Sequence, residues 1–186
     1  MTMICCKEKL KYVLHYVRET FKDYSVQYKI FDLFGLLSLI FRNVAESYSH
    51  LIYSYKHHVC FKKVEAYLRG RVIHKYHDVD KIVMYVLFPW LGVECINHIH
   101  TLWQDHHPCY KDLDDNKAYK PKDEVEWTEA VVDWECARFT KPDKPLNAYD
   151  TYLKYYYKSE YTGVIINTLI SLGLLSVKTT DAGVIY

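Results

Sequence analysis

Apolar residues recur along most of this chain with the period of an amphipathic helix. In residues 7–21 they are spaced by three or four positions and form one stripe, made of Leu10, Val13, Leu14, Val17 and Phe21. A second stripe crosses residues 30–44. Its densest part is shorter than the roughly 20 residues of a membrane span, so we expect a buried helix. A third helix, over residues 50–69, is predicted to stop near Gly70.

Helices are also expected through the rest of the chain. We expect further helices around residues 77–88, 91–107, 124–138 and 149–157, and a core helix in the charge-free segment 161–177. The polar stretch 108–123 predicts a long loop. Only six glycines and five prolines are present, which favours helices over many short strands. The prediction is therefore an all-α, single-domain helical bundle with essentially no sheet.

The length and composition fit one globular domain. Half of the 186 residues are hydrophobic and 25% are charged, which excludes a disordered tail protein. We divide the chain into a helical extension packed on the core (1–48), a helical core domain (49–178) and a C-terminal tail (179–186). The oligomeric state cannot be inferred from these features.

Charge and cysteine usage narrow the choice of partners and compartment. The chain has 24 Lys and Arg against 23 Asp and Glu, a net charge of +1, which disfavours a dedicated nucleic-acid-binding module. The six cysteines show no C-x-x-C pair and no disulfide framework, and charged residues follow Cys6 where a secretion signal would be apolar. We expect a cytoplasmic protein, in the host cytoplasm if the source is viral, with free thiols and no membrane partner.

Histidines are the main candidates for chemistry, because nine of the ten fall between His50 and His107. One histidine on an apolar helix face is ordinarily a core residue, and one acidic residue is ordinarily solvated. Together, however, neutral imidazoles and carboxylates are the donors that bind metal ions. The candidates are His57 or His58, His77, Asp78, His98, His100, His106, His107 and Asp133.

Helix periodicity separates two of the alternatives. His57 has Phe61 and Val64 one and two turns later, as expected of a residue that faces the core, whereas His58 has Lys62 one turn later. We therefore prefer His57. His100 and His107 are seven residues apart, which would place them on one face of the predicted helix 91–107.

The segment His77-Asp78-x-x-Lys81 resembles the His-Asp dyad of the HD superfamily of metal-dependent phosphohydrolases. It is more closely similar to an uncharacterised family of HD-like proteins of phages and bacteria. The matching residues, spread over residues 50–175, are His57, His77-Asp78-Val79-Asp80-Lys81, His100, His106-His107-Pro108, Glu129 to Asp133-Trp134, and Ile165 to Leu169. Asp80 departs from the family pattern, which has a small serine there, and adds a carboxylate that could be a metal ligand or alter the substrate pocket.

The resemblance implies a helical bundle around one or two divalent ions, of Mn, Co, Ni, Zn or Fe. By that resemblance, a first ion would bind His57, His77, Asp78 and Asp133. A second would bind His100 and either His106 or His107, with Asp78 bridging; we take His107 as the ligand and leave His106 for substrate. Asp78 and Lys81 would be catalytic, with Lys81 on a phosphate oxygen of a small, nucleotide-like substrate attacked by metal-activated water.

Membrane association through residues 30–41 or 161–177 is one alternative, and two other interpretations compete with the phosphohydrolase more directly. Cys95-x-x-His98 and His106-x-x-Cys109 have the spacing of a structural zinc site. Alternatively, the chain is a non-catalytic HD-like scaffold that keeps the fold and binds a partner protein. Both would use the same histidine-rich segment without turnover.

Overall fold

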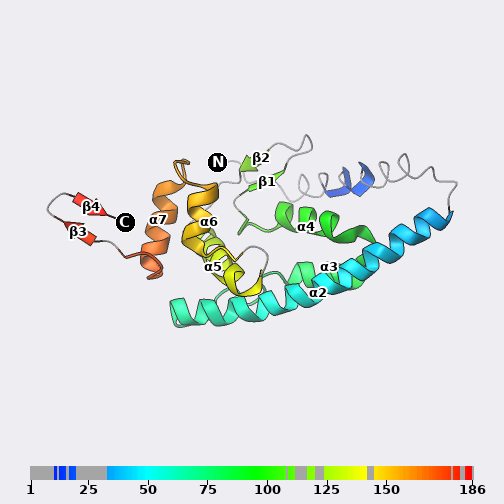
Figure 1. Cartoon of the computed structure of the whole chain (residues 1–186), viewed down its shortest axis with the longest axis horizontal. Coiled ribbons are helices and arrows are strands. Elements are labelled where there is room, and N and C mark those ends of the chain that lie inside the picture. Colours follow the sequence, from blue (N-terminus) through cyan, green and yellow to red (C-terminus); the bar gives the residue numbers. More distant parts are fainter. Residues whose placement is uncertain are drawn as a thin grey trace. The chain divides into compact units, whose positions relative to one another are not determined.

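The structure is a computed structural model that describes residues 11, 13–15, 17–19, 33–107, 109–111, 117–119, 124–141, 145–176, 178–180 and 183–185. Its helices are α2 (Leu33–Arg69), α3 (Val79–Leu87), the 3-10 helix η1 (Pro89–Leu91), α4 (Gly92–Trp103), α5 (Glu124–Thr140), α6 (Ala148–Tyr155) and α7 (Thr162–Ser171) (Figure 1). The all-α prediction is confirmed. The described residues of the predicted helix 7–21 are helical, and the remainder of that prediction lies outside the described residues.

Two short antiparallel ladders correct the expectation of no sheet. Strand β1 (Cys109–Lys111) pairs with β2 (Lys117–Tyr119), inside the segment predicted as a loop. Strand β3 (Lys178–Thr180) pairs with β4 (Gly183–Ile185), from the last residue of the predicted core domain into the segment predicted as a tail. Each strand has three residues, which is too short to leave an alternating pattern in the sequence.

The chain divides into two compact units. The first unit comprises Met1–Ser54 and Asp78–Lys120, and the second comprises Tyr55–His77 and Pro121–Tyr186. The chain passes from the first unit to the second within α2, after Ser54, and returns to the first unit between the consecutive residues His77 and Asp78. The predicted ranges 1–48, 49–178 and 179–186 remain predictions.

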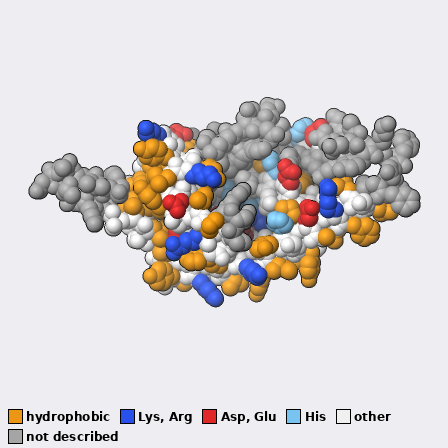
Figure 2. Space-filling model, viewed as in Figure 1, with side chains coloured by type: hydrophobic (Ala, Val, Ile, Leu, Met, Phe, Trp, Pro, Cys, Tyr) orange, Lys and Arg blue, Asp and Glu red, His pale blue; other side chains and the backbone are white. Residues whose placement is uncertain are grey.

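Helix α2 differs from the sequence prediction in length and in burial. The two predicted helices are one, because no glycine or proline interrupts residues 45–49; it ends before Gly70 (φ 69°), as expected. The predicted buried stripe is wrong in its described part, since Leu37, Ile40, Phe41 and Val44 are 36–70% exposed. Figure 2 shows hydrophobic side chains on the surface over α2.

In the first unit, α2 buries polar residues in place of the apolar residues that were expected to face the core. Asn43 Nδ2 donates to the carbonyl oxygen of Trp90 at 3.0 Å, and Ser47 Oγ donates to that of Pro89 at 2.8 Å. These bonds satisfy the turn between α3 and α4. Gly92 begins α4 with a φ of 80°, and a Cβ there would lie 3.1 Å from the Asn43 side chain.

Helix α4 packs against α3 and ends earlier than predicted. Its last residue is Trp103, and Gln104 is extended (φ −81°, ψ 129°). His106 and His107 therefore follow the helix in a turn, and the argument that His107 shares a helix face with His100 is wrong. Because Pro108 disfavours helical backbone in the residue before it, the chain has to leave the helix near this point.

The second unit has a continuous hydrophobic core. Helix α5 packs against α6 and α7, and Trp127, Val131 and Ile165 are among the fully buried side chains. Phe61, near the end of α2, belongs to the same core with 0% exposure. This packing fixes the face of α5 that carries Asp133.

Polar contacts fix the start of α6. Asn147 Oδ1 accepts from the backbone N–H of Asp150 at 2.8 Å, as an N-cap does, and Glu135 Oε2 accepts from that of Ala148 at 3.1 Å. The predicted core helix 161–177 is shorter than expected, because α7 ends before Gly173, whose φ is 69°.

No single helix among the described residues is both long and apolar enough to span a membrane. The pair Val79–Leu87 and Pro89–Trp103 reaches the length and composition only when taken together across a 91° bend.

Candidate metal centres

The second unit brings together three metal-ligating side chains from distant parts of the chain. His57 on α2, His77 before α3 and Asp133 on α5 are all buried, and we call them the His57 cluster. His57 Nε2 lies 2.8 Å from Asp133 Oδ1, and His77 Nε2 lies 3.6 Å from the same oxygen. The two Nε2 atoms are 3.4 Å apart. Three potential ligands thus converge at one point.

Hydrogen bonds on the outer ring nitrogens orient both imidazoles. Thr140 Oγ1–H donates to the carbonyl of Cys136 at 3.2 Å, so its oxygen accepts from His57 Nδ1–H at 2.9 Å. His77 Nδ1–H donates to Glu129 Oε1 at 3.0 Å. Each histidine therefore directs Nε2, the nitrogen with the lone pair in this tautomer, toward Asp133.

The converging atoms of the His57 cluster require a positive charge between them. Two imidazole lone pairs and a carboxylate oxygen are all acceptors, so a proton or a metal ion has to lie among them. Burial raises the pKa of Asp133, but hydrogen bonds and charge from His57 and His77 outweigh it and hold that pKa well below its usual value. Ligands about 2.1 Å from one ion lie about 3 Å or more from each other. The distances of 3.4 and 3.6 Å from His77 Nε2 meet this spacing, whereas the 2.8 Å between His57 and Asp133 is a hydrogen-bond distance that would have to lengthen around an ion.

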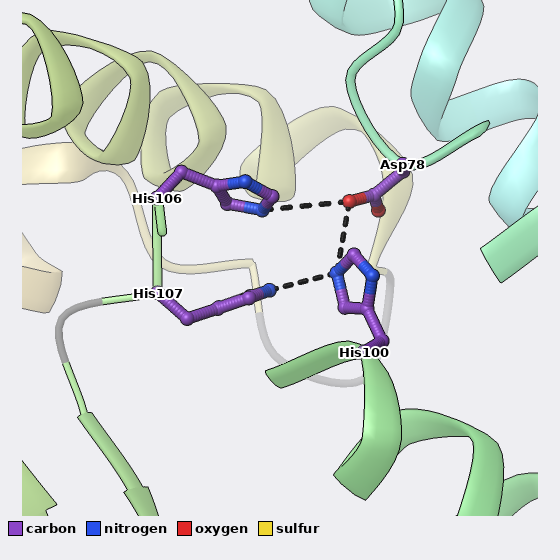
Figure 3. Close-up of side chains that lie close together, drawn as sticks. All are labelled: Asp78, His100, His106 and His107. Carbon is purple, nitrogen blue, oxygen red and sulfur yellow. Dashed lines mark hydrogen bonds and ion pairs between the residues drawn. The ribbon is translucent and has the colours of Figure 1, made fainter. Parts of the chain in front are cut away.

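The first unit contains a second group, Asp78, His100, His106 and His107, which we call the Asp78 cluster (Figure 3). Asp78 Oδ1 lies 3.0 Å from His100 Nε2 and 3.5 Å from His106 Nε2. His107 Nε2 lies 2.9 Å from His100 Nε2. All four side chains could ligate one ion, since their ligand atoms lie within 4.8 Å of one another.

The backbone of Asp78 is held in a left-handed conformation, with φ 58° and ψ 11°. Asp78 precedes α3 at the N-cap position, but its side chain makes no capping hydrogen bond and is directed at the histidines instead. Non-glycine residues in this region are strained by roughly 1–2 kcal/mol, and such strain concentrates at functional sites.

Two further side chains surround the Asp78 cluster. Asp80 Oδ2 accepts from His100 Nδ1–H at 2.9 Å, which directs His100 Nε2 inward. Burial raises the pKa of Asp80, but the hydrogen bond and charge of His100 outweigh it, so the pKa is lowered. Lys81 Nζ lies 3.1 Å from Asp78 Oδ2. Asp80 thus lies on the outer nitrogen of a potential ligand, and Lys81 carries positive charge beside the cluster.

The structure places the predicted site residues in or beside a cluster, except His98, which belongs to neither. His57 belongs to the His57 cluster, whereas His58 Nδ1–H donates to the carbonyl of His77 at 2.6 Å. His106, assigned to substrate from the sequence, lies with His107 in the Asp78 cluster. The specific roles of these residues remain predictions.

Sequence reasoning missed the residues that orient the ligands. Glu129 lies one helical turn before Asp133 on α5, so the i, i+4 spacing could have placed it on the same face. Thr140 lies two turns after Asp133. No local signal marked either as a partner of a histidine 52 or 83 residues away.

The described cysteines do not support the alternative zinc site. Among the side chains that the structure describes, the groups close enough to share an ion contain no cysteine. Burial raises the pKa of the Cys95 thiol to about 11, which disfavours the thiolate that zinc requires. The side chain of Cys109 lies outside the described residues.

No protein-family model, curated protein or solved structure matches this chain.

Proposed function

We propose that the protein is a metal-dependent phosphohydrolase that acts on a small, nucleotide-like phosphoester. The observation that carries the proposal is the buried convergence of two imidazoles and a carboxylate in the His57 cluster. Three protein ligands leave a coordination position for water, as catalytic sites do. The similarity of His77-Asp78-x-x-Lys81 to the HD dyad favours phosphoester hydrolysis as the reaction.

In this proposal the two clusters bind metal ions and Lys81 binds the phosphate. His57, His77 and Asp133 would hold one divalent ion, and the Asp78 cluster would hold another. An ion in such a site activates water for attack on phosphorus and withdraws charge from the phosphate oxygens. Lys81, beside Asp78, would contact a phosphate oxygen as a compact positive charge.

The donor set also favours particular ions and substrates. Sites rich in imidazole suit Mn, Co, Ni, Zn or Fe better than Mg. The net charge of +1 offers no broad positive field for a long nucleic acid, which favours a small phosphorylated substrate.

The test combines metal analysis of the purified protein with a screen of nucleotides and model phosphoesters. We expect bound transition metal, hydrolysis that a chelator abolishes, and loss of turnover in Asp133→Asn. Lys81→Ala should weaken turnover while sparing the metal content. A protein that binds metal but hydrolyses no phosphoester would refute the proposal.

A second candidate is a non-catalytic scaffold, and one observation favours it. The Asp78 cluster supplies four protein ligands, the number that closes the tetrahedron of a structural zinc site. In that case metal removal would lower the thermal stability without any activity to lose. The same screen separates the two candidates.

A further inference from the structure

A chain of side chains in the second unit connects the end of α2 to the ligand His77. Glu65, fully buried on α2, accepts from the backbone N–H groups of Ile73 and His74 at 2.9 and 3.1 Å. His74 Nδ1–H donates to Glu65 Oε1 at 2.6 Å. A buried carboxylate is thereby paired with the loop that leads from Gly70 to His77.

The other nitrogen of His74 continues the chain toward α5. His74 Nε2 lies 3.6 Å from Glu129 Oε2, which is beyond hydrogen-bond distance, and the contact is attractive only when the His74 ring is protonated. The second oxygen of the same carboxylate, Oε1, accepts from His77 Nδ1–H at 3.0 Å. Glu129 therefore has one oxygen on His74 and the other on His77.

Two more contacts fix the ring and backbone of His77. Phe61 stacks on the imidazole, with ring centroids 3.7 Å apart and planes tilted by 15°. His58 Nδ1–H donates to the His77 carbonyl. The ring can hardly rotate without losing the stack on Phe61 and the hydrogen bond to Glu129.

We propose that Glu65, His74 and Glu129 form an outer shell that positions His77 to bind metal through Nε2. The inference rests on the metal binding proposed for the His57 cluster. A carboxylate on the outer nitrogen of a histidine ligand selects its tautomer, orients the ring and makes the ligand more basic; losing such a partner typically costs 10–100-fold in metal affinity. His74 and Glu65 act one step further out, by holding Glu129 and the loop in place.

The experiment is a Co²⁺ titration of the full-length, chelator-treated protein, with binding measured by calorimetry and by visible absorption. Asp133→Asn and Asp78→Asn, each of which removes one ligand charge, assign the binding phases to the two clusters. Glu129→Ala should weaken the phase of the His57 cluster by about 10–100-fold. Glu129→Gln keeps an acceptor oxygen and should restore most of the affinity and the absorption spectrum.

Asp80→Ala is the matched control, because Asp80 has the same role toward His100 in the other cluster. It should weaken the phase of the Asp78 cluster and leave the other unchanged. His74→Ala should cause a smaller loss than Glu129→Ala in the His57 phase. Thermal melts of the metal-free variants show whether each retains the fold.

The outcomes separate this inference from the proposed function. If the wild-type protein shows no phase that Asp133→Asn removes, metal binding at the His57 cluster fails and the outer shell fails with it. If that phase is present and Glu129→Ala leaves its affinity unchanged, only the outer-shell inference is overturned. If Asp80→Ala weakened the His57-cluster phase as much as Glu129→Ala does, the inference would also be overturned, because the effect would not be specific to His77.

Discussion

The left-handed backbone of Asp78 allows its proposed role as a metal ligand to be measured separately from its backbone strain. Three substitutions differ in what they remove. Asp78→Asn loses the charge but tolerates the φ of 58°, Asp78→Gly loses the side chain and relieves the strain, and Asp78→Ala loses the side chain and keeps the strain. All three remove the carboxylate from His100, His106 and Lys81.

The magnitudes follow from these contacts. A charge-assisted hydrogen bond contributes about 1.5–3 kcal/mol, so Asp78→Asn should lower the free energy of unfolding of the metal-free protein by about 2 kcal/mol. Between Ala and Gly, the strain of roughly 1–2 kcal/mol is partly offset by the greater unfolded-state entropy of glycine. Asp78→Ala should therefore be about 1 kcal/mol less stable than Asp78→Gly.

Urea denaturation of the chelator-treated variants measures the stability differences, and metal titration measures the ligand role. We expect all three variants to lose affinity at the Asp78 cluster, since none retains the carboxylate. If Ala proves as stable as Gly, the left-handed conformation is not strained. If Asp78→Asn binds metal as the wild type does, the carboxylate is not a ligand.

Three further predictions concern protons and thiols. Metal binding at the His57 cluster should release protons and strengthen as pH rises, because the ion replaces the proton between His57 and Asp133. Calorimetry in buffers of different ionisation enthalpy would detect the released protons, and a binding enthalpy that does not depend on the buffer would contradict the prediction. The pKa of Asp133 is lower in the folded than in the unfolded state, so its contribution to metal-free stability is present above the unfolded carboxyl pKa and lost as pH falls toward the folded value. Urea midpoints across acidic pH should therefore fall less steeply for Asp133→Asn than for the wild type, and identical slopes would argue against this. Burial raises the pKa of Cys95 to about 11 and raises that of Cys136 as well, so mass spectrometry should find both unmodified by a thiol reagent at pH 7 until the protein unfolds.

The helices of the second unit were largely readable from the sequence. The predicted helices 124–138 and 149–157 match α5 and α6 to within two residues at each end, and Gly70 marked the end of α2. These elements have a buried face and a local stop signal, so short windows of sequence carry the information. The clustering of histidines between His50 and His107 likewise indicated metal chemistry, because it is visible in the sequence without any knowledge of the fold.

Contacts between distant residues decided the rest. Asn43 and Ser47 are buried at the expense of an apolar stripe because their side chains bind the carbonyls of Trp90 and Pro89, more than 40 residues away. Likewise, the end of α4 at Trp103 placed His106 and His107 in a turn, where both reach the Asp78 cluster.

The division of His77 and Asp78 between two ligand groups shows the same limit. The two residues are consecutive, yet one converges with Asp133 on α5 and the other with His100 on α4. A residue's type is local information, and it made both residues candidates. Which partners a side chain meets depends on how helices far apart in the chain pack and on which hydrogen bonds orient each ring, and this is settled only when the chain is folded.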